Sequence, residues 1–203
     1  AWGVDATVSG SQKGLMLPPG LGFVSLNDRA WERQKKGTIP RFYFDLLKEH
    51  TAIVNNQTAY TPAVSLILGL REVLRYFKKE GRETIFARYQ KFSSAMRAAA
   101  GALHLELFSK THSNGVVSLC LPSPVESKSV VKTLRDQYQM MIAKGQGDFT
   151  DSVIRISCIG HREASDLVDV FSALESVLKA QGAQMAFGNG VASLKTALAE
   201  KRP

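Results

Sequence analysis

The stretch SGSQKGLMLPPGLGF, residues 9–23, places one lysine, Lys13, in a small and polar turn. An apolar run and a double proline follow this turn at once. A lysine that only keeps a surface soluble needs no such setting, because any exposed position leaves its amine in water. The setting suits a lysine whose amine is held in one orientation and acts as a nucleophile.

Strand-like patterns flank this stretch on both sides. Residues 4–9 (VDATVS) and 22–27 (GFVSLN) are rich in β-branched residues and predict two strands. Asn27 followed by an aspartate predicts the start of a short helix that runs to about residue 36. A second short helix is expected over residues 44–50.

The clearest helix start lies further along, in TAYTPAVSLILGLRE, residues 58–72. Thr61 is a natural N-cap, and Pro62 suits the first helical position. Gly81 ends the helix, and another helix over 82–102 follows almost without a break. A change of domain is therefore expected near residue 80. The apolar residues at helical spacing are Val64, Ile67, Leu68, Val73, Leu74 and Phe77.

Beyond residue 102 the pattern alternates between strands and helices. A turn is expected at residues 113–115, where Asn114 precedes a glycine. This order predicts a small α/β or α+β layer domain. The expected strands cover 104–109, 115–121, 140–145 and 153–159, and the expected helices cover 124–138, 162–182 and 191–201.

Composition narrows the classes of function. The 203 residues carry a formal net charge of +8, but the densest basic cluster lacks the interleaved aromatic residues of a nucleic-acid platform. We read that cluster as a solvated helix and loop, so no nucleic-acid partner is expected. Its members are Arg29, Arg33, Lys35, Lys36 and Arg41.

Cysteines, hydropathy and the first residues give further expectations. Cys120 and Cys158 sit in apolar strand-like runs and predict buried free thiols in a reducing, cytoplasmic compartment. No Cys/His spacing suggests a metal site, and no apolar run is long enough to span a membrane. The chain begins AWGVDATV, without methionine, so we expect it to be the interior of a longer protein.

The motifs resemble a known family. VDATVSGSQKGLMLPPGLGFVSLN, residues 4–27, looks like the cofactor-lysine segment of class V aminotransferases, which are fold-type I pyridoxal-phosphate enzymes. The similarity is greatest to alanine–glyoxylate and serine–glyoxylate aminotransferases. Residues 58–72 and VIRISCIGH, residues 153–161, match the same family in order and rough spacing. The resemblance implies an α/β fold in which residues 1–80 end the large cofactor-binding domain and 81–203 form the small C-terminal domain.

The resemblance also implies a role for the lysine turn. Lys13 would form the internal aldimine with pyridoxal 5'-phosphate and then move a proton between the substrate Cα and the cofactor C4′. Ser11 and Gln12 would bind the cofactor beside it. Without the two downstream matches, Lys13 would read as a surface turn lysine.

Two more sites follow from the family. Thr58, Tyr60 and Thr61, at a helix N-terminus that favours anions, would bind the cofactor phosphate of a neighbouring subunit, which implies a homodimer with shared active sites. Plain capping of the helix by Thr61 is the alternative. Arg155 interrupts an apolar strand and would bind the substrate α-carboxylate with its planar fork. The alternative for Arg155 is an ion pair with a structural carboxylate.

The implied function is transfer of an amino group from a serine- or alanine-like amino acid to glyoxylate or pyruvate. Pyridoxamine–pyruvate or ureidoglycine–glyoxylate transamination, and a lyase of the same fold, are alternatives within the enzymes. A binding module without catalysis is the alternative outside them. In the family, the acidic partner of the pyridine nitrogen, the stacking aromatic residue and the phosphate loop lie upstream of the lysine, so the upstream portion of the protein is an expected partner.

Overall fold

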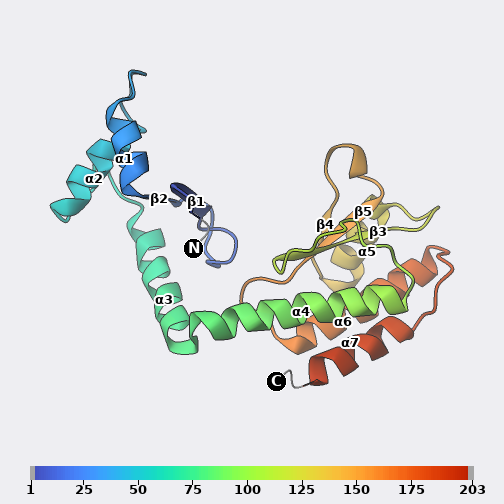
Figure 1. Ribbon diagram of the computed structural model, residues 1–203. Coiled ribbons are helices and arrows are strands. Elements are labelled where there is room, and N and C mark those ends of the chain that lie inside the picture. Colours follow the sequence, from blue (N-terminus) through green and yellow to red (C-terminus); the bar gives the residue numbers. More distant parts are fainter. Residues whose placement is uncertain (1–2, 201–203) are drawn as a thin grey trace. The chain divides into compact units, whose positions relative to one another are not determined.

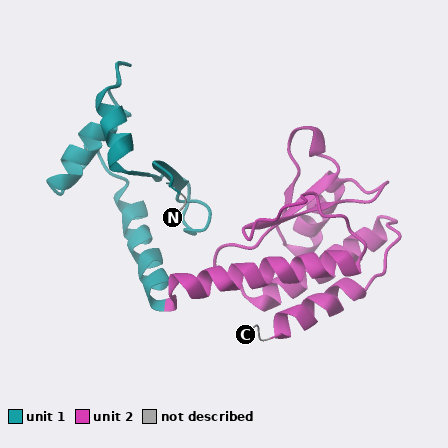
Figure 2. Ribbon diagram, viewed as in Figure 1, with its two compact units in different colours: residues 1–79 teal, residues 80–203 magenta. Residues whose placement is uncertain are grey.

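The computed structural model describes residues 3–200 of the chain. The chain divides into two compact units, residues 1–79 and residues 80–203 (Figure 2). The assignment of these units to a large and a small domain of an enzyme stays a prediction.

Unit 1 begins with a hairpin that carries the lysine turn. Strands β1 (Ala6–Gly10) and β2 (Gly22–Leu26) pair antiparallel, and Gly10 lies opposite Gly22 where the loop of residues 11–21 begins and ends. At the other end of the hairpin, Asp5 accepts hydrogen bonds from Asn27 and from Arg29, which also forms an ion pair with it. These bonds tie the start of β1 to the helix that follows β2.

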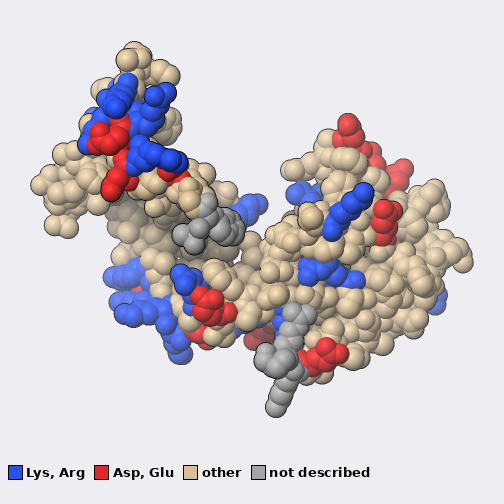
Figure 3. Space-filling view, viewed as in Figure 1, with Lys and Arg blue, Asp and Glu red and all other residues tan. Residues whose placement is uncertain are grey.

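Three helices complete unit 1 (Figure 1). Two of them begin at side-chain caps: Asn27 accepts a hydrogen bond from the Ala30 amide at 3.0 Å, and Asp45 accepts one from the Leu47 amide at 3.0 Å. On the face shown in Figure 3, basic side chains over α1 alternate with acidic ones, and Lys35 pairs with Glu32 at 2.7 Å. The helices are α1 (Asp28–Lys35), α2 (Leu46–Val54) and α3 (Val64–Glu80).

The start of α3 differs from the sequence prediction. The helix begins at Val64, so Ala63, and not Thr61, is the residue before it. The reason lies in the backbone: the Val64 amide donates to the Pro62 carbonyl in a tight turn, and the first α-type bond joins the Ile67 amide to the Ala63 carbonyl. Thr61 therefore belongs to the extended segment ahead of the helix, and its predicted capping role is wrong.

Unit 2 is a three-stranded antiparallel sheet packed on helices. The strand order is β3-β5-β4, and α4 contacts α6, α7 and β3, while α5 contacts β4, β5 and α6 (Figure 1). The 17-residue α6 and the 21-residue α4 supply most of the buried helical residues. The elements are α4 (Arg82–Ala102), β3 (Val116–Cys120), α5 (Ser127–Tyr138), β4 (Ala143–Lys144), the 3-10 turn Gly147–Phe149, β5 (Val153–Ser157), α6 (Ala164–Ala180) and α7 (Asn189–Ala199).

The core lies between one face of this sheet and the helices. Successive residues of a strand point to opposite faces, so β3 buries Val117 and Leu119, and β5 buries Ile154 and Ile156. Arg155, between the last two, is only half-buried and belongs to the open face. In unit 1, by contrast, Ser11 is the only buried residue among those that the structure describes.

Three local predictions for unit 2 are wrong. Residues 104–109 form an isolated bridge between Leu107 and Leu119 instead of a strand, because few backbone bonds join this segment to β3. The strand expected over 140–145 shortens to Ala143–Lys144, because the chain turns into the 3-10 turn soon afterwards. Cys120 is half-buried, because the alternation of β3 places it on the open face, whereas Cys158 is buried as predicted.

Candidate active site

The loop that carries Lys13 is built around a buried serine. The Ser11 hydroxyl donates to the Pro18 carbonyl at 2.7 Å and accepts from the Leu21 amide at 3.2 Å. The Ser11 backbone adds two bonds: its amide donates to the Leu21 carbonyl, and its carbonyl accepts from Leu17, each at 3.1 Å. Four bonds through one fully buried residue fix the shape of the loop.

Lys13 stands on the outer turn of this loop. Its carbonyl accepts from the Met16 amide at 2.9 Å, which closes the turn, and Met16 takes the left-handed conformation with φ +56°. The Lys13 side chain is exposed and makes no hydrogen bond or ion pair within residues 3–200. The backbone at Lys13 is therefore fixed by the turn, and its amine is left open to a ligand.

Gln12 folds back against the end of β1. A Cβ added at Gly10 would lie 2.7 Å from the Gln12 side-chain oxygen, so no larger residue fits at position 10 while Gln12 keeps this place. A glycine ahead of the lysine turn thus allows the amide of Gln12 to lie close to the backbone.

The double-proline half of the loop rests on α3. A Cβ at Gly69 of α3 would lie 2.9 Å from Leu17, and a Cβ at Gly20 would lie 2.6 Å from Leu66. These close approaches bring the lysine loop against the helix that follows residues 58–62. Gly69 interrupts the apolar pattern of this helix, and that interruption is the one sequence signal for the contact.

The segment ahead of α3 contains the three predicted phosphate residues. Thr58 donates from its hydroxyl to the Tyr60 carbonyl at 2.6 Å, whereas Thr61 is exposed and its hydroxyl has no partner within the described range. The Tyr60 hydroxyl donates to the Phe42 carbonyl at 2.7 Å and accepts from the Lys48 ammonium at 3.0 Å. Thr61 is thus the free hydroxyl of the three.

Sequence reasoning missed the surroundings of Tyr60. Its ring stacks on Tyr43 with centroids 4.3 Å apart, and the Lys48 nitrogen lies 4.5 Å from its centroid. Phe42 belongs to the same cluster, with its centroid 6.4 Å from that of Tyr60. The adjacent aromatic residues in RFYFD, 41–45, were the available signal, but they contained no indication of their partner.

Arg155 lies on the open face of the sheet in unit 2. In the ladder it stands between Ser118 of β3 and Ala143 of β4, and its Nε donates to the Lys144 carbonyl at 2.9 Å. No carboxylate forms an ion pair with it among residues 3–200. The predicted alternative of a structural ion pair is therefore wrong for the described residues, and both terminal nitrogens are left for a ligand.

The predicted site residues thus form two groups. Ser11, Gln12 and Lys13 share one loop of unit 1, which packs on α3, and the segment 58–61 leads into that same helix. Arg155 belongs to unit 2.

Outside these two groups, the described part of the chain has few features that indicate a reactive thiol, a metal site or a membrane span. Burial raises the pKa of the Cys158 thiol to about 11, although the cations Arg97 and Arg162 partly lower it. Residues 3–200 hold no group of three or more histidine, cysteine or acidic side chains arranged to bind a metal ion. None of their helices is both long and apolar enough to cross a membrane.

Comparison with known proteins identifies the family of this chain. The model of the aminotransferase class-V family matches residues 1–170. The L-aspartate–glyoxylate aminotransferase of Paracoccus denitrificans is 33% identical over 99% of this chain and 53% of that protein. A protein of Synechococcus sp. (strain PCC 6716) named soluble hydrogenase, small subunit, is 36% identical over 97% of this chain and 52% of its own length.

The fold of this chain is also similar to that of solved aminotransferase structures. The pyridoxamine–pyruvate aminotransferase of Mesorhizobium loti superposes with a TM-score of 0.90 at 26% identity, over 96% of this chain and 51% of that one. The fold is therefore that of fold-type I, pyridoxal-phosphate-dependent aminotransferases. The chain belongs to the class-V aminotransferase family, and it spans about half the length of the curated relatives it matches.

Family membership implies pyridoxal 5'-phosphate as cofactor, and the residues present fit it. An aldehyde needs a free primary amine, and Lys13 offers one on a loop with a fixed backbone. A phosphate needs hydrogen-bond donors, and the exposed Thr61 hydroxyl lies ahead of the N-terminus of α3, where free amides favour negative charge.

Proposed function

We propose that the protein containing this chain is a pyridoxal-phosphate-dependent aminotransferase that acts on small amino acids. Its amino donor would be serine- or alanine-like, and its acceptor would be glyoxylate or pyruvate. The observation that carries the proposal is the free amine of Lys13 on a loop that Ser11 fixes and α3 supports. The relatives whose names include glyoxylate or pyruvate support the acceptor class.

Lys13 would have two tasks. Its amine would hold the cofactor covalently before the substrate arrives, and the released amine would afterwards take up or return the proton of the substrate Cα. The bound cofactor supplies an electron sink for the electrons left on Cα. Ser11 would act through the loop and not by direct contact, because it is buried and both of its hydroxyl bonds stay within the loop. Gln12, which is exposed, would donate to the cofactor.

The cofactor phosphate would be bound by residues 58–61 of a neighbouring subunit in a homodimer. Thr61 would be the principal donor, because its hydroxyl is free, and Thr58 would add its hydroxyl after turning away from the Tyr60 carbonyl. Tyr60 would keep Lys48 near the phosphate, since the two side chains share a hydrogen bond. A cytoplasmic location fits the free thiols of Cys120 and Cys158.

Arg155 would orient the substrate by its α-carboxylate. Nε is occupied by the Lys144 carbonyl, so the two terminal nitrogens would bind the carboxylate as a fork. The residues beside it in the ladder, Ser118 and Ala143, are small and uncharged. They offer no second cation, and we therefore favour amino acids with one carboxylate over dicarboxylic donors.

Spectra test the activity and separate its alternatives. The purified full-length protein should absorb in the visible range, and Lys13→Ala should lose this band while the matched control Lys35→Ala, an exposed lysine paired with Glu32, keeps it. When one amino acid is added without an acceptor, the visible band should be replaced by the band of the cofactor's amine form. The conversion should then stop. A lyase would restore the original band. A colourless protein, unchanged by Lys13→Ala, would leave a binding module as the function.

A further inference from the structure

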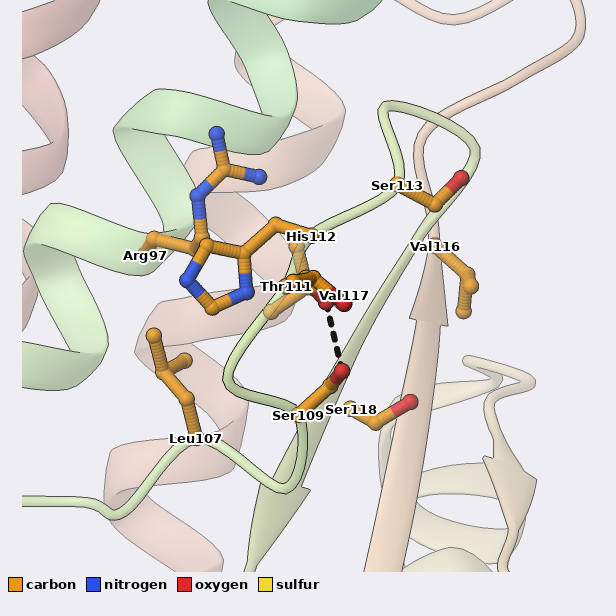
Figure 4. Close-up of a pocket in the computed structure, with 9 residues that line it drawn as sticks. All are labelled: Arg97, Leu107, Ser109, Thr111, His112, Ser113, Val116, Val117 and Ser118. Atoms are coloured by element: carbon orange, nitrogen blue, oxygen red, sulfur yellow. Dashed lines mark hydrogen bonds between the residues drawn. The ribbon is translucent and has the colours of Figure 1, made fainter.

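A cavity in unit 2 does not direct its polar groups at one ligand. It has a volume of about 180 Å³ and lies between β3, the loop before β3 and α4 (Figure 4). The guanidinium of Arg97 points away from the hydroxyls of Ser113 and Ser118, and its Nη2 already donates to the Ser94 hydroxyl. By contrast, the lysine loop of unit 1 makes contacts that bear directly on the proposed reaction.

The internal bonds of the lysine loop fix its shape but not its place. The four hydrogen bonds through Ser11 join residues of the loop to one another. The strands that carry the loop give it little support, because most residues of β1 and β2 are exposed within the described chain. A contact outside the hairpin is therefore needed to hold the turn of Lys13 at one position.

That contact is made with α3 and consists of two leucines, each lying over a glycine. Leu17 of the loop lies over Gly69 of α3, where a Cβ would be 2.9 Å from the Leu17 Cδ2. In the opposite direction, Leu66 of α3 lies over Gly20 of the loop, where a Cβ would be 2.6 Å from the Leu66 Cδ1. Ordinary contact between carbon atoms begins at about 3.5 Å, so neither glycine can be replaced unless the facing leucine moves.

Leu17 is connected to the lysine turn through the backbone. Its amide donates to the Ser11 carbonyl at 3.1 Å, and the amide of the preceding residue, Met16, donates to the Lys13 carbonyl at 2.9 Å. Leu17 is half-buried, whereas Lys13 is exposed. A displacement of Leu17 is thus transmitted to the turn of Lys13 by these backbone hydrogen bonds.

We propose that α3 positions the lysine turn for catalysis, and that Gly69 and Leu17 are the positioning residues. The proposal rests on the proposed function of Lys13. Gly69 acts by leaving space, because the missing side chain lets Leu17 rest on the helix and so sets the distance between loop and helix. A displacement of about 1 Å in a reacting group can cost about 10²-fold in rate. This role explains why α3 keeps a glycine in its interior, where glycine is unfavourable for a helix.

Hydrogen exchange tests the contact without relying on the cofactor's chemistry. In the full-length protein, Gly69→Val should raise the exchange rate of the amides at residues 11–21 at least about tenfold, because the loop is pushed off the helix. The matched control is Gly101→Val in α4, where an added Cβ has no packing neighbour within 4 Å. Valine is a better helix former than glycine, so helix propensity does not account for a loss in Gly69→Val.

Variants of Leu17 decide the assignment even where Gly69→Val fails to fold. Leu17→Ala removes the same contact without a clash, so it should raise the exchange of the loop about threefold. In the double variant of Leu17→Ala and Gly69→Val, the valine occupies the space left by the leucine, and exchange should return to within about threefold of the unaltered protein. Unchanged exchange in Leu17→Ala, no recovery in the double variant, or equal exchange in Gly69→Val and Gly101→Val would overturn the positioning by α3.

Kinetics separate this proposal from the proposed function. Gly69→Val should lower kcat about tenfold and change KM less than about threefold, because Arg155, and not the loop, would bind the substrate carboxylate. Lys13→Ala should lose the cofactor band but keep the exchange of the loop, since the Lys13 side chain makes no hydrogen bond within residues 3–200. A band that disappears in Lys13→Ala, together with an unchanged kcat in Gly69→Val, would reject the positioning role and leave the proposed function intact.

Discussion

Replacing Arg155 tests how the open face of the sheet binds a substrate. The Nε of Arg155 is held by the Lys144 carbonyl at 2.9 Å, so two terminal nitrogens are available for the substrate carboxylate. A hydrogen bond to a charged group contributes about 1.5–3 kcal/mol, so Arg155→Ala, which removes two of them, should cost about 3–6 kcal/mol of substrate interaction. At about 1.4 kcal/mol for each factor of ten, kcat/KM should fall roughly 10²- to 10⁴-fold.

The assay is the rate of conversion of the visible band over a range of amino acid concentrations. Arg155→Lys keeps one charge but loses the planar fork and the bond to Lys144, so it should recover only part of the loss. Affinity for the cofactor, measured by the same band, should change less than about twofold in both variants. Arg135→Ala serves as the control at an exposed arginine. An unchanged kcat/KM in Arg155→Ala, or an equal loss of cofactor affinity, would refute the assigned role.

Two further predictions concern unit 2. Glu175 of α6 is buried and accepts hydrogen bonds from the amides of Gly188 and Val191 at the start of α7. Glu175→Ala should therefore lower the free energy of unfolding, measured in urea titrations, by about 3 kcal/mol. The control Asp169→Ala, at an exposed position of the same helix, should lower it by less than about 0.5 kcal/mol. Equal effects of the two would contradict this capping. The raised pKa of Cys158 means that the unfolded chain loses this proton at lower pH than the folded chain, so stability should decline between about pH 9 and the folded value of about 11. Cys158→Ala should flatten this decline in the free energy of unfolding, and an unchanged slope would reject the link.

Local signals predicted much of the fold. The glycine at 81 separates α3 from α4 as expected, and the helices expected over 82–102 and 162–182 are α4 and α6 to within a few residues. The prediction of a strand over 104–109 is wrong, because the alternation of apolar and polar residues indicates only which face of a segment is apolar. It does not show whether a neighbouring strand supplies backbone partners along the whole segment.

The sequence proposes site residues by type, but it does not give their contacts. Lys13 and Arg155 were proposed from their settings together with the family resemblance, and their roles stay predictions. The bonds of Ser11 to Pro18, Tyr60 to Phe42 and Arg155 to Lys144 were not predicted, because each joins residues that only the folded chain brings together. The helix start at Val64 was also missed, since a tight turn at the Pro62 carbonyl competes with capping by Thr61.

The most direct test of the account is chemical trapping of the cofactor on the protein. The purified full-length protein would be reduced with borohydride, digested and analysed by mass spectrometry. The account predicts the pyridoxyl group on the peptide that contains Lys13, and its absence from Lys13→Arg. A pyridoxyl group on another lysine, or no modified peptide from a protein that absorbs in the visible range, would contradict the assignment of Lys13.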